Sequence, residues 1–461
     1  MGSSEANDHD RQFAMPAALY LVALACMVAL VLAANRQQVI TKDEASTAFV
    51  YPSFLELRLQ HHIFATNFYA YVFFSWVNHL HAGLFASRFA KAVVMALTCP
   101  SVFLYLRRRF SFNVPEAGLA AVTIVLLPGV MCLSWVGVEF GMDTPIGFLA
   151  LWLALFPHPA AIVASCVCAA LAAGSYGSGL AFLAVVILHQ LPRFRNRQTR
   201  AAAILGMVAI AALLLFPIVW WTNFQSLFVG GGGRPRLAGA IGRLASLIQE
   251  LFVRGDSYYY FSGGVPAMGH LWIGILSLIG AVWATARYPR KCWPLLATGT
   301  IVVGLYAIAG NVIGVRRAIP LVVCLGIFAA TFVRDLAAKA GAWRIPVYCA
   351  ALLPLLAAEA AVDNRVRSDL AQARIALPLD FEFRIAPGKS MAWTIEALAK
   401  GTLKLPPDLE GYEPDRTLAM LYQMTQPNPI VSAGELVQRC DEHGWSIPSH
   451  SRRFSRLVAR H

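Results

Sequence analysis

The chain carries too little charge to give water-soluble domains a polar surface. Of its 461 residues, 58% are hydrophobic and only 14% are charged, whereas charged residues make up about 25% of an average soluble domain. A soluble chain of this length would form about two or three domains, each with its own polar coat. Most of the chain must therefore be solvated by lipid. This excludes a cytosolic enzyme, a secreted disulfide scaffold and a disordered chain.

Apolar runs divide the sequence into about eleven predicted membrane spans. The first run, Phe13 to Ala34, is too long for the core of a cleaved signal peptide and is interpreted as a retained anchor. The later runs lie near 83–106, 117–135, 144–157, 159–175, 177–191, 201–221, 270–286, 293–310, 318–333 and 345–362. We therefore expect an all-α polytopic membrane protein, with a transmembrane domain over 1–363 and a small water-exposed C-terminal domain over 364–461.

Basic residues gather in short loops on one side of this predicted bundle. Lys and Arg cluster at 107–109, 193–200, 287–291 and 334–344, and all four clusters fall on the side of the N-terminus. The positive-inside rule then predicts a cytoplasmic N-terminus in a plasma (inner) membrane, with any chemistry on the outer face. Because these clusters account for the basic balance of +13, no nucleic-acid partner is predicted.

Two outer segments are longer than ordinary connectors. Residues 35–80 space their apolar side chains as an amphipathic helix does, and a second such piece lies near 237–253, after four glycines at 230–233. We expect both amphipathic helices to lie along the outer membrane surface.

Acidic residues in the outer segments are candidates for a general base. Asp43 and Glu44 follow the first span closely, and a solvated acidic loop is the alternative interpretation. Glu139 and Asp143 are four residues apart, so a helical turn would put them on one face. Asp143 also precedes a Thr-Pro pair, as the N-cap of a helix would. A capping role would account for an acidic residue at Asp143, but it gives no reason for one at Glu139.

Basic residues on the same outer side need an anionic partner. Arg316 and Arg317 occupy a very short outer turn, where the positive-inside rule disfavours them, so we expect them to bind a phosphate. Arg88 and Lys91 lie near the outer end of their predicted span. They either grip a lipid phosphate or snorkel to ordinary headgroups.

The remaining motifs are weaker. Tyr258 belongs to an aromatic run that could stack on a sugar ring, although an interfacial aromatic belt is the alternative. No histidine has metal-ligand spacing with another ligand class, and the glycine run lacks the Lys-Ser/Thr ending of a phosphate-binding loop. The cysteines lie mostly in apolar runs and predict no disulfide framework. We therefore predict neither a metal nor a cofactor.

Taken in order, these blocks resemble the GT-C superfamily of membrane glycosyltransferases, in particular its protein-mannosyltransferase and aminoarabinose-transferase branch. The resemblance spans 35–335 and rests on Asp43-Glu44-Ala45, Phe85–Phe89, Arg107–Phe110, Asp143–Leu151 and Arg316–Leu321. The chain departs from the family in two places. The glycine-rich break around Tyr176 lacks the family's basic residue, and Arg317 replaces the aromatic that commonly follows the arginine of the late turn.

The resemblance implies a transferase that moves a sugar from a polyprenyl-phosphate donor to an acceptor hydroxyl on a glycan, lipid or protein. A carboxylate deprotonates the acceptor, and cations stabilise the charge that grows on the departing polyprenyl phosphate. In these terms Asp43 is the general base, Glu44 orients the acceptor, and Asp143 is a second carboxylate or the alternative base. The cations expected at the donor phosphate are Arg316, Arg317, Arg88 and Lys42. The residues expected to bind substrate are Glu139 and Tyr258.

Two other functions fit part of the pattern. A lipid-linked glycan polymerase, ligase or flippase would also use outer arginines on a lipid diphosphate. A flippase should carry charges along a path through its spans, and the predicted spans are almost uncharged, which disfavours transport. In a non-catalytic membrane scaffold, the outer acids and arginines would have no chemical role.

Overall fold

The fold comes from a computed structural model of the chain, which describes residues 3–36, 68–80, 84–194, 196–221, 239–255, 264–308 and 314–371. In this described part the chain forms α-helices and short 3-10 turns, with no strand. The all-α prediction is therefore confirmed. The predicted C-terminal domain lies almost wholly outside the described residues and remains a prediction, although helix α17 continues past the proposed boundary to Ala371.

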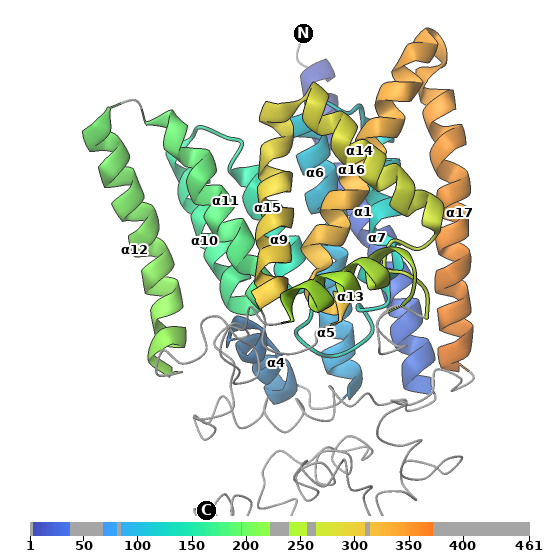
Figure 1. Cartoon of the computed structure of the whole chain (residues 1–461), viewed down its shortest axis with the longest axis horizontal. Helices are drawn as coiled ribbons and strands as arrows, with labels where there is room; N and C mark the ends of the chain where they lie inside the picture. The colour runs from blue at the N-terminus through green and yellow to red at the C-terminus, as the bar shows by residue number, and fades with distance from the viewer. Residues whose placement is uncertain are drawn as a thin grey trace, which may run out of the picture.

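The α-helices are named as in Figure 1 and are α1 (Ser3–Arg36), α4 (Phe68–Leu80), α5 (Leu84–Ala96), α6 (Thr98–Phe110), α7 (Val114–Val125), α8 (Pro128–Met131), α9 (Asp143–Leu153), α10 (Pro159–Ser175), α11 (Leu180–Gln190), α12 (Arg197–Trp221), α13 (Ala240–Phe252), α14 (Leu271–Arg287), α15 (Pro289–Ile308), α16 (Ile319–Ala337) and α17 (Arg344–Ala371). The 3-10 turns are η2 (Gly177–Gly179), η3 (Leu191–Arg193), η5 (Val315–Arg317) and η6 (Ala338–Trp343).

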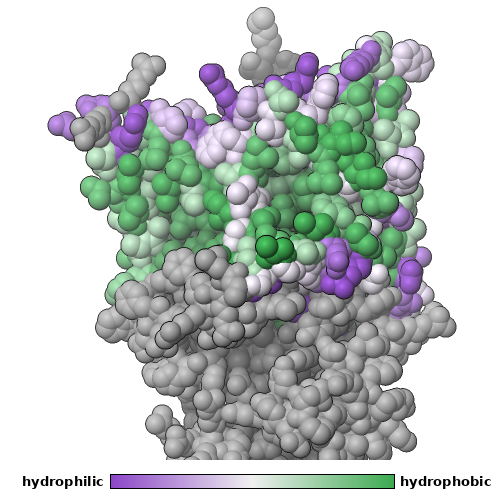
Figure 2. Space-filling model, viewed as in Figure 1, coloured by the Kyte–Doolittle hydropathy of each residue, from purple (hydrophilic) through white to green (hydrophobic). Residues whose placement is uncertain are grey.

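The long helices stand side by side and give the bundle two distinct ends (Figure 1). The turns that follow α6, α11, α14 and α16 lie at the end where the chain begins, whereas α4 and α13 lie at the opposite end. Arg109 donates a hydrogen bond to the carbonyl of Lys291 at 3.1 Å, and Arg334 donates to the carbonyl of Phe110, so the basic clusters meet there. We call this the basic end. Figure 2 shows hydrophilic residues along it and an apolar belt below.

Five helical stretches of the described part are long and apolar enough to cross a membrane: Ala14–Ala34, Phe85–Phe110, Gln198–Phe216, Pro289–Ile308 and Ile319–Asp369. The last of these includes both α16 and α17, joined by η6. Shorter apolar helices, among them α7, α9, α10 and α14, accompany them. The chain is therefore a multi-pass membrane protein, and the figure of about eleven spans remains a prediction from the apolar runs.

Prolines shape two of the predicted spans. The run predicted at 83–106 lies within one membrane-crossing stretch, Phe85–Phe110, whose helices α5 and α6 meet at Leu97 because Pro100 in the first turn of α6 has no N–H to donate to the preceding turn. The prediction of one continuous helix over 117–135 was wrong for the second half of that run. Helix α7 ends at Val125, Pro128 starts the short helix α8, and residues 132–142 form irregular turns.

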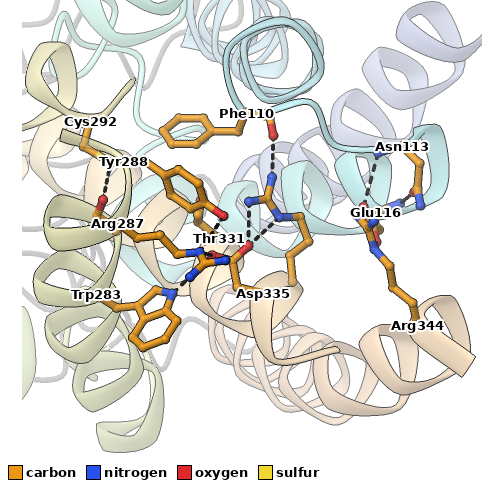
Figure 3. Close-up of polar contacts among 12 residues, drawn as sticks. Phe110, Asn113, Glu116, Trp283, Arg287, Tyr288, Cys292, Thr331, Asp335 and Arg344 are labelled. Atoms are coloured by element: carbon orange, nitrogen blue, oxygen red, sulfur yellow. Dashed lines mark hydrogen bonds and ion pairs between the residues drawn. The ribbon is translucent and has the colours of Figure 1, made fainter. Parts of the chain in front are cut away.

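Polar contacts tie the helix ends together at the basic end (Figure 3). The carboxylate of Asp335 on α16 pairs with Arg334 at 2.6 Å and accepts a hydrogen bond from the indole of Trp283 on α14 at 3.1 Å. Glu116, in the first turn of α7, is fully buried and forms a capping box with Asn113. Both of its oxygens also accept hydrogen bonds from Arg344 at the start of α17, at 2.6 and 2.7 Å.

Replacing Glu116 by Ala is expected to lower the free energy of unfolding by about 2 kcal/mol, because it removes the carboxylate that accepts the Asn113 N–H in the capping box and leaves Arg344 without its partner. This expected loss of stability is smaller than that for breaking a fully buried ion pair, since the Arg344 side chain is 36% exposed. Denaturant-induced unfolding of the purified protein in detergent measures the loss. Arg365→Ala, which breaks an exposed pair with Asp369, is the matched control and should change stability by less than about 0.5 kcal/mol. Equal losses in the two variants would contradict this account.

Candidate active site

The irregular segment 132–142, between α8 and α9, is buried along its whole length. Its backbone follows no regular helix, so its carbonyls need partners from elsewhere. The ammonium of Lys91, fully buried on α5, donates to the carbonyl of Val138 at 2.7 Å and to that of Phe140. Lys91 was expected to grip a lipid phosphate or snorkel to headgroups. The structure corrects this, because Lys91 fixes the path of the segment instead.

Arg88 lies one helical turn before Lys91 on α5 and is also fully buried. Its guanidinium carbon is 5.1 Å from the centroid of the Trp135 ring, a distance at which cation–π attraction operates. Protein therefore encloses Arg88, and the alternative of snorkelling to ordinary headgroups is wrong. Arg88 and Lys91 both contact the segment 132–142.

Asp143 is the first residue of α9, with Met142 at the N-cap position, so the predicted capping role of Asp143 is wrong. Its carboxylate is fully buried, and one oxygen, Oδ2, accepts a hydrogen bond from the hydroxyl of Ser178 at 2.6 Å. The other oxygen, Oδ1, has no hydrogen-bond partner among the described residues. Ser178 belongs to η2, which packs tightly on α10: a β-carbon at Gly179 would overlap the carbonyl of Ala172.

The aromatic pair Phe140 and Tyr176 forms the centre of the cluster. Their rings meet edge to face with centroids 5.6 Å apart, and the guanidinium carbon of Arg316 lies 5.6 Å from the centroid of Phe140. The charges of Glu139, Asp143, Arg316 and Arg317 all act on the hydroxyl of Tyr176. The structure therefore brings together four predicted site residues from two distant parts of the sequence. They lie toward the end of the bundle opposite the basic end, where α9 and α16 begin (Figure 1).

The structure changes the reason why Glu139 and Asp143 are neighbours. Glu139 precedes α9 in the irregular segment, so the two carboxylates do not share a helical face as predicted. Both nevertheless act electrostatically on Lys91. The predicted site residues outside the described part of the chain are Asp43, Glu44, Lys42 and Tyr258, and their roles stay predictions.

Sequence reasoning missed three residues of this cluster: Phe140, Tyr176 and Ser178. Tyr176 and Ser178 lie in the glycine-rich break, whose small residues permit the close packing of η2 on α10. That composition was the signal that could have found them. Within the described residues, no group of three or more His, Cys, Asp or Glu side chains could hold a metal ion.

No family model and no curated protein matches the chain. Solved structures do match it. It aligns with ArnT from Cupriavidus metallidurans in the apo state with a TM-score of 0.56 and 14% identity, covering 94% of this chain and 89% of that one. The chain therefore shares the fold of this ArnT structure. The same ArnT bound to undecaprenyl phosphate gives a TM-score of 0.52 and 14% identity over 92% of this chain and 88% of that one. The predicted resemblance to the GT-C superfamily is thus confirmed at the level of the fold.

Proposed function

We propose that the chain is a glycosyltransferase that moves a sugar from a polyprenyl-phosphate donor to an acceptor hydroxyl at the outer face of the membrane. The observation that carries the proposal is the buried cluster around the pair Phe140–Tyr176, in which Arg316 lies 5.6 Å from the Phe140 ring, Asp143 accepts a hydrogen bond from Ser178, and Glu139 directly precedes Phe140 in the chain. Buried charges inside a membrane bundle are costly and mark functional sites. The fold shared with ArnT, one structure of which is bound to undecaprenyl phosphate, supports the class of donor.

The arginines stabilise the leaving group of the reaction. As the bond between the sugar and the phosphate breaks, negative charge grows on the polyprenyl phosphate, and nearby guanidinium groups stabilise it. We assign this role to Arg316 and Arg317, with Arg88 and Lys42 as further contacts. Because the lipid carries its own leaving group, the reaction needs neither a nucleotide nor a cofactor.

The carboxylates activate and orient the acceptor. Asp43 takes the proton of the acceptor hydroxyl as that oxygen attacks the anomeric carbon, and Glu44 orients the acceptor. Asp143 is the second carboxylate and the alternative base, since its Oδ1 has no hydrogen-bond partner among the described residues while Ser178 orients the other oxygen. Glu139 and Tyr258 bind the substrate.

Release of polyprenyl phosphate from a lipid-linked sugar tests this proposal. The purified protein should release it only when a sugar acceptor is present. A flippase and a membrane scaffold would both leave the bond between the sugar and the phosphate intact. Unbroken donor after incubation with active acceptor preparations would therefore contradict a transferase.

The proposed orientation puts the basic end in the cytoplasm and the site at the outer face. A single cysteine at Arg254, exposed just after α13, should react with a membrane-impermeant maleimide in intact cells, whereas one at Lys339, exposed in η6, should react only after permeabilisation. The background is a variant in which the native cysteines are replaced by serine or alanine. The reverse pattern would place the site in the cytoplasm and contradict the proposed localisation.

A further inference from the structure

The cationic turn that carries Arg316 is too short to hold its own shape. It is a single 3-10 turn, η5, closed by bonds from the Arg317 N–H to the Gly314 carbonyl at 3.1 Å and from the Ala318 N–H to the Val315 carbonyl at 2.7 Å. One isolated turn is not stable in any helix, because ordering its residues costs more than its few bonds return. The place of Arg316 therefore depends on contacts from other elements.

Glu250 of α13 makes such a contact. Its side chain is 1% exposed and lies on the buried side of this amphipathic helix with Leu247 and Leu251. A buried carboxylate needs strong hydrogen-bond donors. One oxygen of Glu250 accepts the backbone N–H of Val315 at 2.6 Å, and the other accepts the hydroxyl of Ser246 at 3.4 Å.

Helix α13 is itself held at both ends, so it presents Glu250 in a fixed place. Near its start, Arg243 donates two hydrogen bonds to the carbonyl of Ala307 on α15, at 2.9 and 2.7 Å. At its end, the N–H groups of Ala267 and Met268 donate to the carbonyls of Glu250 and Leu251 at 2.9 and 3.1 Å. Figure 1 shows α13 lying across the ends of the upright helices.

We propose that Glu250 is a positioning residue that sets Arg316 for the phosphate of the lipid donor. Val315 directly precedes Arg316, so the bond from its N–H to Glu250 fixes where the Arg316 side chain begins, beside Phe140. Glu250 acts through the backbone of η5. A surface helix thereby determines the geometry of the buried phosphate site. The inference rests on the proposed function, because it assigns Arg316 to the donor phosphate.

Two substitutions break this bond from opposite sides. Glu250→Ala removes the acceptor. Val315→Pro removes the donor without changing any charge, and the local backbone suits it: Val315 is the first residue of η5, and Gly314 is extended, with ψ 163°. Glu250→Gln keeps an acceptor oxygen and serves as the conservative variant. Gln249→Ala, at an exposed position of the same helix, is the matched control.

The measurement is the dissociation constant of undecaprenyl phosphate for each purified full-length variant, with thermal unfolding and turnover at saturating donor recorded in parallel. Glu250→Ala and Val315→Pro should each weaken binding by about tenfold, the scale of one charge-assisted bond. The double variant should bind within about twofold of either single variant, because both changes remove the same contact. Glu250→Gln should stay within about threefold of the unchanged protein, and Gln249→Ala should bind as that protein does. Turnover at saturating donor should fall less than binding does.

The outcomes separate this inference from the function on which it rests. If Arg316→Ala weakens binding while Glu250→Ala and Val315→Pro leave it unchanged, Glu250 does not position Arg316. Additive losses in the double variant would also overturn the inference, because the two groups would then act independently. If the unchanged protein fails to bind undecaprenyl phosphate, the proposed function itself is wrong. If Arg316→Ala binds it equally well, the assignment of Arg316 to the donor phosphate is wrong, and this inference with it.

Discussion

Replacing Asp43 by Asn is expected to slow sugar transfer by about 10²–10⁴-fold, the usual range for the loss of a general base. The amide is nearly isosteric and still forms hydrogen bonds, but it cannot take the proton of the acceptor hydroxyl. Donor binding should be retained, because the substitution leaves the arginines untouched. The initial rate of transfer at saturating donor and acceptor, measured on purified protein, gives the size of the effect.

The matched variant is Asp143→Asn, which keeps an oxygen for the hydroxyl of Ser178. As the second carboxylate, Asp143 should matter less, and we expect a loss of about tenfold, equivalent to about 1.4 kcal/mol. Near-normal transfer in Asp43→Asn together with abolished transfer in Asp143→Asn would exchange the two roles. Full activity in both variants would contradict a mechanism that uses a carboxylate as the base.

Replacing Arg316 by Ala is expected to lower kcat/KM for the lipid donor by about tenfold to a hundredfold, the equivalent of about 1.5–3 kcal/mol for a bond between charged groups. Because the phosphate is present in both ground and transition states, part of this loss should appear in KM and part in kcat. Arg316→Lys keeps the charge but loses the planar fork of donors, and it should recover only part of the activity. Steady-state kinetics at limiting and saturating donor measure the split.

The control for Arg316 is an arginine at the other end of the bundle. Arg287, exposed at the end of α14, lies in the basic cluster, so Arg287→Ala removes one positive charge far from the site. It should leave kcat/KM for the donor within about twofold. A loss equal to that of Arg316→Ala would mean that general membrane electrostatics, and not a phosphate contact, determine donor use.

The helices and the sides of the bundle could be predicted from local patterns in the sequence. The amphipathic segment predicted at 237–253 is α13, Ala240–Phe252, because apolar residues at helical spacing need only one buried face to form a helix. The basic clusters were predicted to share one side, and the structure joins Arg109 to Lys291 across 182 residues. Both predictions depend on composition and period, which require no knowledge of tertiary contacts.

The irregular segment 132–142 could not be predicted in this way. Its first residues, 132–135, continue the apolar run before them, and the prediction therefore extended a helix to 135. The segment leaves the helix after Pro128, and Lys91 can satisfy its carbonyls only because α5 lies beside it. Likewise, the bond from Val315 to Glu250 joins residues 65 positions apart. Nothing in the sequence near either residue indicates the other.

Arginines and acids were therefore predicted as separate candidates, and only the structure assembled them. Arg316 was selected because it lies on the side disfavoured for cations, and Asp143 because it precedes a helix. In the structure Arg316 lies beside Phe140, whose ring meets that of Tyr176, and Asp143 accepts a hydrogen bond from Ser178, two residues after Tyr176. Tyr176 was noted from the sequence only as part of a departure from the family pattern. The chemical role of each residue could thus be inferred from the sequence, whereas the assembly of these residues into one site could not.

The most direct test of the central claim is the release of polyprenyl phosphate by the purified protein in lipid nanodiscs supplied with polyprenyl-phosphate-linked sugars and a membrane extract as acceptor. The proposed function predicts that the released lipid and the glycosylated acceptor accumulate together. It also predicts that Asp43→Asn and Arg316→Ala strongly reduce both products while Arg287→Ala does not. Release that is equal in all four proteins, or an intact donor in every reaction that contains a competent acceptor, would contradict it.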